Sequence, residues 1–320
     1  MTAPVARRAA AVAAAVLALA LAACGGGDEE AASTPRPATT APSTAGPAAP
    51  APAPLLAEDA RASFDALQRR LGGRIGIAVE PLGEGGAQVL GALDAGPAWS
   101  TMKVPLVVAL MRAEAPAGLT ARQAAYARLA IVASDNAAAA RLFDDLSARS
   151  GGEIAAARAI ERVLRDAGDP VTRVATEPDP RGFSSWGQTD WGAGASATLA
   201  SALARGCLLP EADTGKLLTW MGHVEPDQSF GLGAAGYPTA TALALKAGWG
   251  PGDDGVYLVR EIGVVGTGPR AYSVALLAIP DAAPGASFAA GASMLDEMAA
   301  WVREHVGDRA TARASRPCAP

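Results

Sequence analysis

The sequence has few of the residues that most metal sites and catalytic triads use. Its 320 residues include two histidines, His223 and His305, and three cysteines. An HExxH zinc site is therefore excluded, and a Ser-His-Asp triad would need one of these two histidines without a GxSxG nucleophile elbow to accompany it. Three cysteines are too few for a disulfide framework or a Cys-rich zinc site. We expect no metal and no cofactor.

Basic residues are also scarce, and lysine most of all. Lys plus Arg number 27 against 32 Asp plus Glu, for a formal charge of -5. This balance argues against a nucleic-acid partner, which selects a basic surface. Only Lys103, Lys216 and Lys246 are lysines. Because a buried lysine can lose its proton and an arginine cannot, these three are candidates for amine chemistry, although they could equally be ordinary surface residues.

The N-terminus has the layout of an export signal. Arg7 and Arg8 precede an apolar run over residues 9–23, which is too short to be a comfortable membrane span. The run ends in Leu-Ala-Ala before Cys24, which resembles the lipobox of bacterial lipoproteins. The resemblance implies a signal peptide over residues 1–23 and lipid attachment to Cys24. The alternative is an ordinary cleavage site next to an incidental cysteine.

The next segment has the composition of a tether. Residues 25–54 contain seven prolines and no aliphatic residue larger than alanine, so they cannot bury enough apolar surface to fold. We expect a disordered tether over residues 24–54 and a domain over residues 55–306. Residues 307–320 should form a flexible tail. A lipid anchor would place the domain outside the cytoplasm, held to the cell membrane by that anchor alone.

Hydrophobic periodicity predicts an α+β fold of the broad α/β class. A helix over residues 55–71 precedes two strands, an Ala- and Leu-rich helical block fills residues 101–208, and three strands and a closing helix follow. The predicted strands are 74–79, 88–92, 241–246, 255–265 and 272–279, and the closing helix is 289–305. The simplest assembly is a five-stranded antiparallel sheet whose terminal helices share one face, with the helical block inserted elsewhere.

Ser100 and Lys103 begin an apolar, helix-like run. Positions i and i+3 share a helix face, so the two side chains can meet. A serine hydroxyl is a weak nucleophile that needs a neighbouring base, and a buried, neutral lysine can serve. By itself the pair is better explained by an N-cap serine near a lysine that reaches to solvent.

Two further triplets are ambiguous alone. Ser134-Asp135-Asn136 follows a helical stretch and is typical of a cap or turn. Lys246-Ala247-Gly248 ends the predicted strand over residues 242–245, where a glycine turn would lead the chain out of the sheet.

Together and in this order, the three patterns resemble the active-site-serine family of β-lactamases and penicillin-binding proteins, whose signatures are S-x-x-K, S-D-N and K-T-G. The resemblance covers residues 60–305, and class A β-lactamases are the most similar, also through the Gly-Asp-Pro-Val-Thr-Arg run at 168–173. It implies a β-lactamase-like fold and a monomeric serine hydrolase. Such an enzyme would form an acyl-enzyme with a β-lactam or a peptidoglycan-derived peptide. The alternatives are a D,D-peptidase or an esterase with the same site, and an inactive cell-wall-binding lipoprotein.

The resemblance implies a role for each matching residue of the first two motifs. Ser100 would be the nucleophile, and Lys103 its proton acceptor or the organiser of one. Ser134 would pass a proton to the leaving nitrogen. Asn136 would orient Lys103 and the substrate amide.

The third motif would bind substrate. Lys246 would attract the substrate carboxylate, and Gly248 precedes Trp249, whose backbone N–H would complete an oxyanion hole with that of Ser100. Ala247 departs from K-T-G and removes a hydroxyl that would bind the carboxylate, so the KM for penicillins should be high.

Glu177 is the candidate base for deacylation. Glu177-Pro178 is similar to the start of the class A E-x-x-L-N motif, but Asp179-Pro180-Arg181 breaks it. The attacking water would lose one expected ligand, and we expect slow deacylation.

Cys207 and Cys318 are expected to be free thiols. A disulfide is permitted outside the cytoplasm, but Cys318 belongs to the predicted tail. Asp144-Asp145 indicates a solvated helix face. Finally, Trp186, Trp191 and Trp220 suit either a sugar-binding groove or core packing, the more common use.

Overall fold

The computed structural model describes residues 54–307 and 310–318. The predicted signal peptide, the lipid-attachment residue Cys24 and all of the predicted tether except Pro54 lie outside the described residues. Within the described part of the chain, no helix is long and apolar enough to cross a membrane.

A five-stranded antiparallel sheet forms the centre of the fold, as the periodicity predicts. Its strand order is β2-β1-β7-β6-β5, so β2 and β5 are the two edges. The strands are β1 (Arg74–Pro81), β2 (Gln88–Gly91), β5 (Leu243–Pro251), β6 (Tyr257–Val265) and β7 (Tyr272–Ile279). A separate two-stranded ribbon pairs β3 (Ala95–Pro97) with β4 (Asp190–Gly192).

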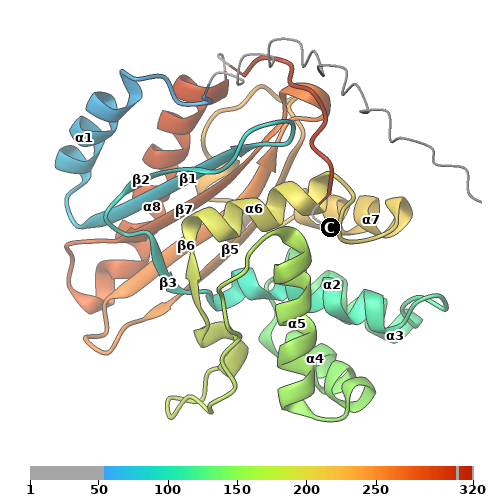
Figure 1. The fold of residues 1–320 in the computed structure, drawn as a ribbon. Helices are drawn as coiled ribbons and strands as arrows, with labels where there is room; N and C mark the ends of the chain where they lie inside the picture. The colour runs from blue at the N-terminus through green and yellow to red at the C-terminus, as the bar shows by residue number, and fades with distance from the viewer. Residues whose placement is uncertain (1–53, 308–309, 319–320) are drawn as a thin grey trace, which may run out of the picture. The chain divides into compact units, whose positions relative to one another are not determined.

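The terminal helices α1 (Ala60–Leu71) and α8 (Pro284–Val302) cover one face of the sheet, while α6 (Ala193–Ala204) crosses the other (Figure 1). Alternate residues of β1 enter two different clusters: Ile77 packs in the cluster that contains α1 and α8, and Ala78 in the one that contains α6. The two terminal helices are joined by a hydrogen bond of 3.0 Å from Trp301 Nε1 to Ser63 Oγ. The predicted placement of both helices on one face is confirmed.

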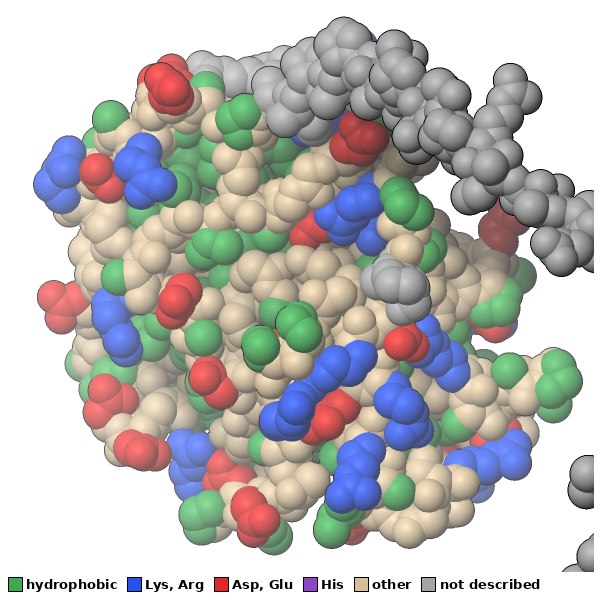
Figure 2. Space-filling model, in the orientation of Figure 1, with side chains coloured by type: hydrophobic (Ala, Val, Ile, Leu, Met, Phe, Trp, Pro, Cys, Tyr) green, Lys and Arg blue, Asp and Glu red, His purple; other side chains and the backbone are tan. Residues whose placement is uncertain are grey.

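The helical block contains α2 (Lys103–Ala113), α3 (Ala121–Val132), α4 (Asn136–Ser150), α5 (Glu153–Ala167) and α7 (Glu211–Met221). Helix α2 is buried from Lys103 to Met111 and forms the centre of this block. Helix α5 is amphipathic: Ile160 and Val163 are buried, and Arg158 and Arg162 are exposed. Figure 2 shows basic side chains gathered over the helical block on this face of the molecule.

The predictions of two free thiols and of a loose C-terminal tail are wrong for the described residues. Cys207 and Cys318 form a disulfide with a Cα–Cα distance of 5.4 Å. Residues 310–318 run back over the domain, where Arg316 pairs with the buried carboxylate of Glu80 and Arg313 N donates to Pro269 O at 3.0 Å. These long-range contacts hold a segment whose local composition is that of a flexible tail.

Candidate active site

Ser100 lies on a strained turn between the β3–β4 ribbon and helix α2. It is the second residue of the 3-10 helix η1 (Trp99–Met102), and it is half-buried. Trp99 has a φ of 48°, a left-handed conformation that costs a bulky residue about 1–3 kcal/mol and persists only where the surroundings enforce it. The Trp99 ring packs edge-on against Phe183 with centroids 5.0 Å apart. Packing around the tryptophan therefore holds the serine in place.

Lys103, the first residue of α2, lies with its amine among the S-D-N residues. Its Nζ donates to Ser134 O, to Asn136 Oδ1 at 2.8 Å and to Ser134 Oγ at 3.3 Å. Burial lowers the pKa of Lys103 to about 7, against an opposing effect of the Asp135 carboxylate. Near neutral pH, a large fraction of this amine is therefore able to accept a proton.

The Ser134-Asp135-Asn136 turn is also strained. Ser134 has a φ of 55°, and Asp135 caps helix α4 by accepting a hydrogen bond of 2.6 Å from Ala138 N. The cap starts α4 at Asn136, so the helix boundary fixes the position of the Asn136 amide.

Lys246, on strand β5 of the sheet, reaches the Ser134 hydroxyl. Its side chain is fully buried, and its Nζ donates to Ser134 Oγ at 2.9 Å and to Ala247 O at 2.8 Å. Burial and the nearby charge of Lys103 hold the pKa of Lys246 well below its usual value. The prediction that Lys246 and Gly248 end a strand is wrong, because β6 continues to pair with β5 as far as Pro251 opposite Tyr257.

A buried acid lies on strand β6, next to the Lys246-Ala247-Gly248 motif of strand β5. Glu261 pairs with Ala247 in the β5–β6 register, and both residues are fully buried. Burial raises the pKa of Glu261 to about 8, even though Leu232 N donates to its Oε2 at 2.8 Å. At neutral pH this carboxyl is therefore mostly protonated.

Gly248 brings strand β5 against the serine turn. A Cβ at Gly248 would lie 2.8 Å from the backbone nitrogens of Ser100 and Thr101. Only a glycine allows this approach. The two backbone donors predicted for the oxyanion hole, at Ser100 and Trp249, therefore belong to two segments that meet at Gly248.

A cavity of about 390 Å³ opens beside Ser100, and we call it the Ser100 cavity. Ser100, Lys103, Asn136 and Trp249 line it, whereas Ser134 and Lys246 are not among its lining residues and are joined to it through Lys103, which donates to Ser134. The rest of its lining contains four more aromatic residues, two acids and small residues: Trp99, Phe143, Phe183, Trp186, Asp144, Glu153, Ala140, Gly182, Ser184, Ser185 and Gly187.

Most of this lining has no local sequence signal. Phe143 and Glu153 come from two helices and Phe183 from a loop, so only the tertiary fold brings them together. Of the three tryptophans singled out in the sequence, Trp186 lines the cavity. Trp191 is instead fully buried beneath the Arg260 guanidinium, whose carbon lies 5.4 Å from the ring centroid.

Glu177 lies on an exposed loop and is not among the residues that line the Ser100 cavity. Arg181 of the same loop ties it to the end of β5: Nη1 donates to Pro251 O at 2.9 Å, and Nη2 pairs with Asp179 Oδ2 at 2.8 Å. The structure thus brings together Ser100, Lys103, Ser134, Asn136, Lys246, Gly248 and Trp249, whereas no contact in the described part of the chain joins Glu177 to them.

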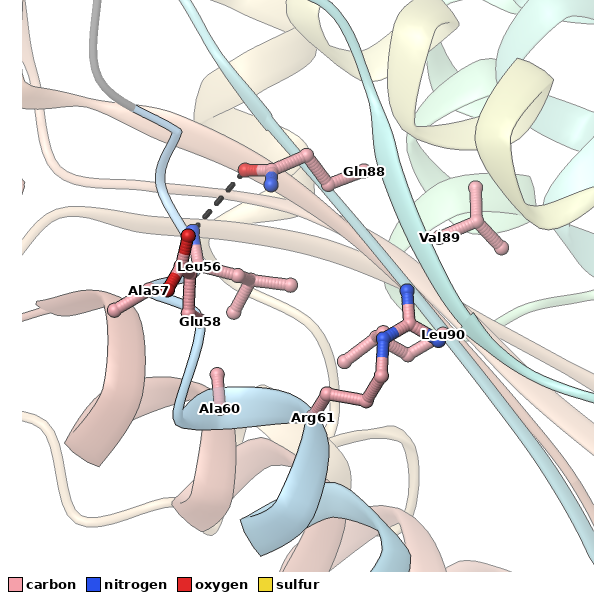
Figure 3. A pocket seen from close by; sticks show the side chains of 8 residues that line it. All are labelled: Leu56, Ala57, Glu58, Ala60, Arg61, Gln88, Val89 and Leu90. Atoms are coloured by element: carbon pink, nitrogen blue, oxygen red, sulfur yellow. Dashed lines mark hydrogen bonds between the residues drawn. The ribbon is translucent and has the colours of Figure 1, made fainter.

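A larger cavity of about 540 Å³ lies between the start of α1 and strand β2 (Figure 3). Its charged residues are Glu58 and Arg61, and Gln88 Oε1 accepts a hydrogen bond of 3.1 Å from Leu56 N across it. It lies at the β2 edge of the sheet, opposite the β5 edge, and no serine, lysine or cysteine lines it. It offers no nucleophile, so the Ser100 cavity is the better candidate. Among the described residues, no group of three His, Cys, Asp or Glu side chains is placed to hold a metal ion.

Comparison with solved structures identifies the fold. A class A β-lactamase from Mycobacterium abscessus is 21% identical with a TM-score of 0.61, covering 78% of this chain and 99% of its own. A β-lactamase from Xanthomonas campestris pv. campestris is 23% identical with a TM-score of 0.61, and the match covers 78% of this chain and 97% of the other. The chromosome-encoded β-lactamase of Vibrio parahaemolyticus is 16% identical with a TM-score of 0.61, and the match covers 77% of this chain and 98% of the other. No family model and no curated protein matches the sequence. The chain has the serine β-lactamase-like fold, as its three motifs predict.

Proposed function

We propose that this protein is a serine hydrolase that forms an acyl-enzyme with β-lactams through Ser100. The observation that carries the proposal is the meeting of two buried lysines at one hydroxyl: Lys103 Nζ and Lys246 Nζ lie 3.3 and 2.9 Å from Ser134 Oγ. Burying two amines together is costly, and such groups are concentrated at functional sites. The β-lactamase fold of the solved relatives supports the same chemistry.

Acylation would use these residues in order. Neutral Lys103 takes the Ser100 hydroxyl proton while Oγ attacks the lactam carbonyl carbon, and the carbonyl oxygen becomes an oxyanion held by the N–H groups of Ser100 and Trp249. The C–N bond then breaks. The leaving nitrogen takes the Ser134 hydroxyl proton, which the ammonium of Lys103 replaces.

Binding would place the substrate carboxylate on the Lys246 side of the site. Lys246 supplies positive charge once it is protonated, and Asn136 Oδ1 keeps the Lys103 amine in position. Since Ala247 supplies no hydroxyl for the carboxylate, we expect weak capture and a high KM.

Deacylation would be slow. General-base help is worth about 10² to 10⁴ in rate, and Glu177, the candidate base, is exposed on its loop. Within the described part of the chain, the carboxylates that line the Ser100 cavity belong to Asp144 and Glu153. The exposed position of Glu177 favours one second candidate, a penicillin-binding D,D-peptidase, which would hydrolyse its natural peptidyl acyl-enzyme but release a penicilloyl group slowly.

A fluorescent penicillin tests the proposal. Wild type and Ser100→Ala are incubated with the label, denatured at successive times and separated by electrophoresis. A stable label on wild type alone supports a penicillin-binding protein, and a label that appears and decays supports a slow β-lactamase. Equal labelling of Ser100→Ala, or none of wild type, would refute acylation at Ser100.

We also propose that the chain is a monomer anchored outside the cytoplasm by lipid on Cys24. The disulfide between Cys207 and Cys318 supports this location, because disulfides persist mainly in oxidising compartments. Cys24→Ala should abolish incorporation of radiolabelled palmitate and release the protein from the membrane fraction. Retention of the label by this variant would exclude Cys24 as the attachment site.

A further inference from the structure

The walls of the Ser100 cavity are suited to an aromatic group. Trp99 packs edge-on against Phe183, and Phe143 lies against Trp186 with ring centroids 6.3 Å apart. Trp249 completes the aromatic lining. Aromatic walls with a few polar groups are typical of sites that enclose an apolar part of a small ligand.

Two acids line the same cavity from the helical block. Asp144 is on α4, two turns beyond Asn136, and Glu153 is the first residue of α5. Asp144 is only weakly paired, with its Oδ2 3.7 Å from Arg141 Nη1 and both side chains well exposed. Glu153 forms no ion pair with any residue that the structure describes. These carboxylates thus remain available to a cation in the cavity.

No basic side chain among the described residues that line the cavity neutralises the charges of Asp144 and Glu153. Lys103 is the one basic residue among the described residues that line it, and its amine is bonded to Ser134 and Asn136. The outer part of the cavity is therefore aromatic and negatively charged, whereas the amine of its basic residue, Lys103, is held at the Ser134 and Asn136 side. A ligand that matches this arrangement carries its acyl carbon at one end and a positive charge at the other.

We propose that the Ser100 cavity selects acyl groups whose side chain joins an aromatic or apolar body to a cationic amine. The preference rests on the proposed function, since it presumes that Ser100 receives the acyl group. Two sources offer this chemistry: an amino-substituted β-lactam and a peptide stem with a free amine. Exposed ion pairs change affinity only a few-fold each and are screened by salt, so the preference should be moderate and salt-dependent.

Binding to Ser100→Ala tests the preference without chemistry. Trp99, Trp186 and Trp249 line the cavity, so their fluorescence reports occupancy. Ampicillin, benzylpenicillin and carbenicillin carry an amine, a hydrogen and a carboxylate at the same side-chain carbon. We expect ampicillin to bind about fivefold more tightly than carbenicillin at low salt, with benzylpenicillin between them. The second pair is Nα-acetyl-lysyl-D-alanyl-D-alanine with its side-chain amine free or acetylated.

Control variants locate the effect. Asp144→Asn combined with Glu153→Gln should equalise the affinities, as should 0.5 M salt. Asp145→Asn is the matched control, because Asp145 is the next residue of α4, pairs with Arg122 at 3.4 Å and does not line the cavity. It should leave the preference unchanged.

The outcomes separate this inference from the proposed function. A preference in the peptide pair alone would assign the amine to a peptide stem, and one in the penicillin series to a β-lactam side chain. Equal affinities in both, no measurable binding of any probe, or a preference that survives in the double variant would overturn the inference. Acylation of wild type by benzylpenicillin, read by mass spectrometry, tests the proposed function separately.

Discussion

Gly248 touches Ser100 through backbone atoms: a Cβ on Gly248 would lie 2.8 Å from the Ser100 nitrogen. This contact fixes strand β5 against the turn that carries the serine. An oxyanion bound by the N–H groups of Ser100 and Trp249 requires the two segments to keep this spacing. The glycine therefore sets the geometry of the proposed reaction without taking part in it.

Gly248→Ala should lower the acylation rate by about 10²-fold, because it forces the two donors apart. Overpacking should also lower the free energy of unfolding by about 1–3 kcal/mol. Stopped-flow acylation and urea denaturation measure the two effects. Gly215→Ala is the control, since Gly215 lies in α7 with open space around its Cβ position. An unchanged acylation rate in Gly248→Ala would show that the contact has no bearing on the reaction.

Lys103→Arg should lower acylation by about 10² to 10⁴-fold although the positive charge is kept, because an arginine cannot act as a base at neutral pH. Lys216→Arg is the matched control: Lys216 is on the exposed surface of α7 and pairs with Asp213 at 3.1 Å. Rates of penicillin acylation in the two variants are compared under identical conditions. Equal tolerance of arginine at both positions would exclude Lys103 as a proton acceptor.

Acylation should rise with pH through about 7. The pKa of Lys103 is lowered to about 7 by burial, and only the neutral amine accepts a proton. The second-order rate constant of acylation should therefore increase about tenfold per pH unit below this value and level off above it. A profile measured from pH 5 to 9 checks this. A rate that is independent of pH in this range would contradict it.

The fold was largely accessible from the sequence, because its strands and terminal helices carry clear hydrophobic periodicity. The five strands and their face-sharing helices are found close to their predicted positions. The errors occur where long-range contacts override local composition. The polar segment 310–318 is held by Arg316 and Cys318, and β5 continues past Gly248 because β6 pairs with it.

The disulfide is expected to stabilise the domain. In the Cys24→Ala variant of the full chain, a free-thiol assay under denaturing conditions should find none, since Cys207 and Cys318 are joined. Reduction, or Cys207→Ala with Cys318→Ala, should lower the free energy of unfolding by about 2–4 kcal/mol, because the bond constrains a long loop of the unfolded chain. Two free thiols would contradict the structure.

The site was predicted only in part. Three short motifs suffice to name Ser100, Lys103 and Ser134, because each motif keeps its residues at fixed local spacing. The cavity walls consist of residues from separate segments of the chain, such as Phe143 and Phe183, and no local sequence pattern predicts that these residues line it. The left-handed backbone of Trp99 and Ser134 was equally hidden, since neither residue type favours it.

Mass spectrometry of the intact protein after incubation with benzylpenicillin shows whether Ser100 forms an acyl-enzyme. Ser100 is half-buried beside a cavity, and Ser100→Ala should leave the fold intact, as circular dichroism can verify. We expect an adduct with the mass of the penicillin on wild type, mapped to the peptide that contains Ser100, and none on Ser100→Ala. An adduct of the same mass that persists in folded Ser100→Ala would contradict it.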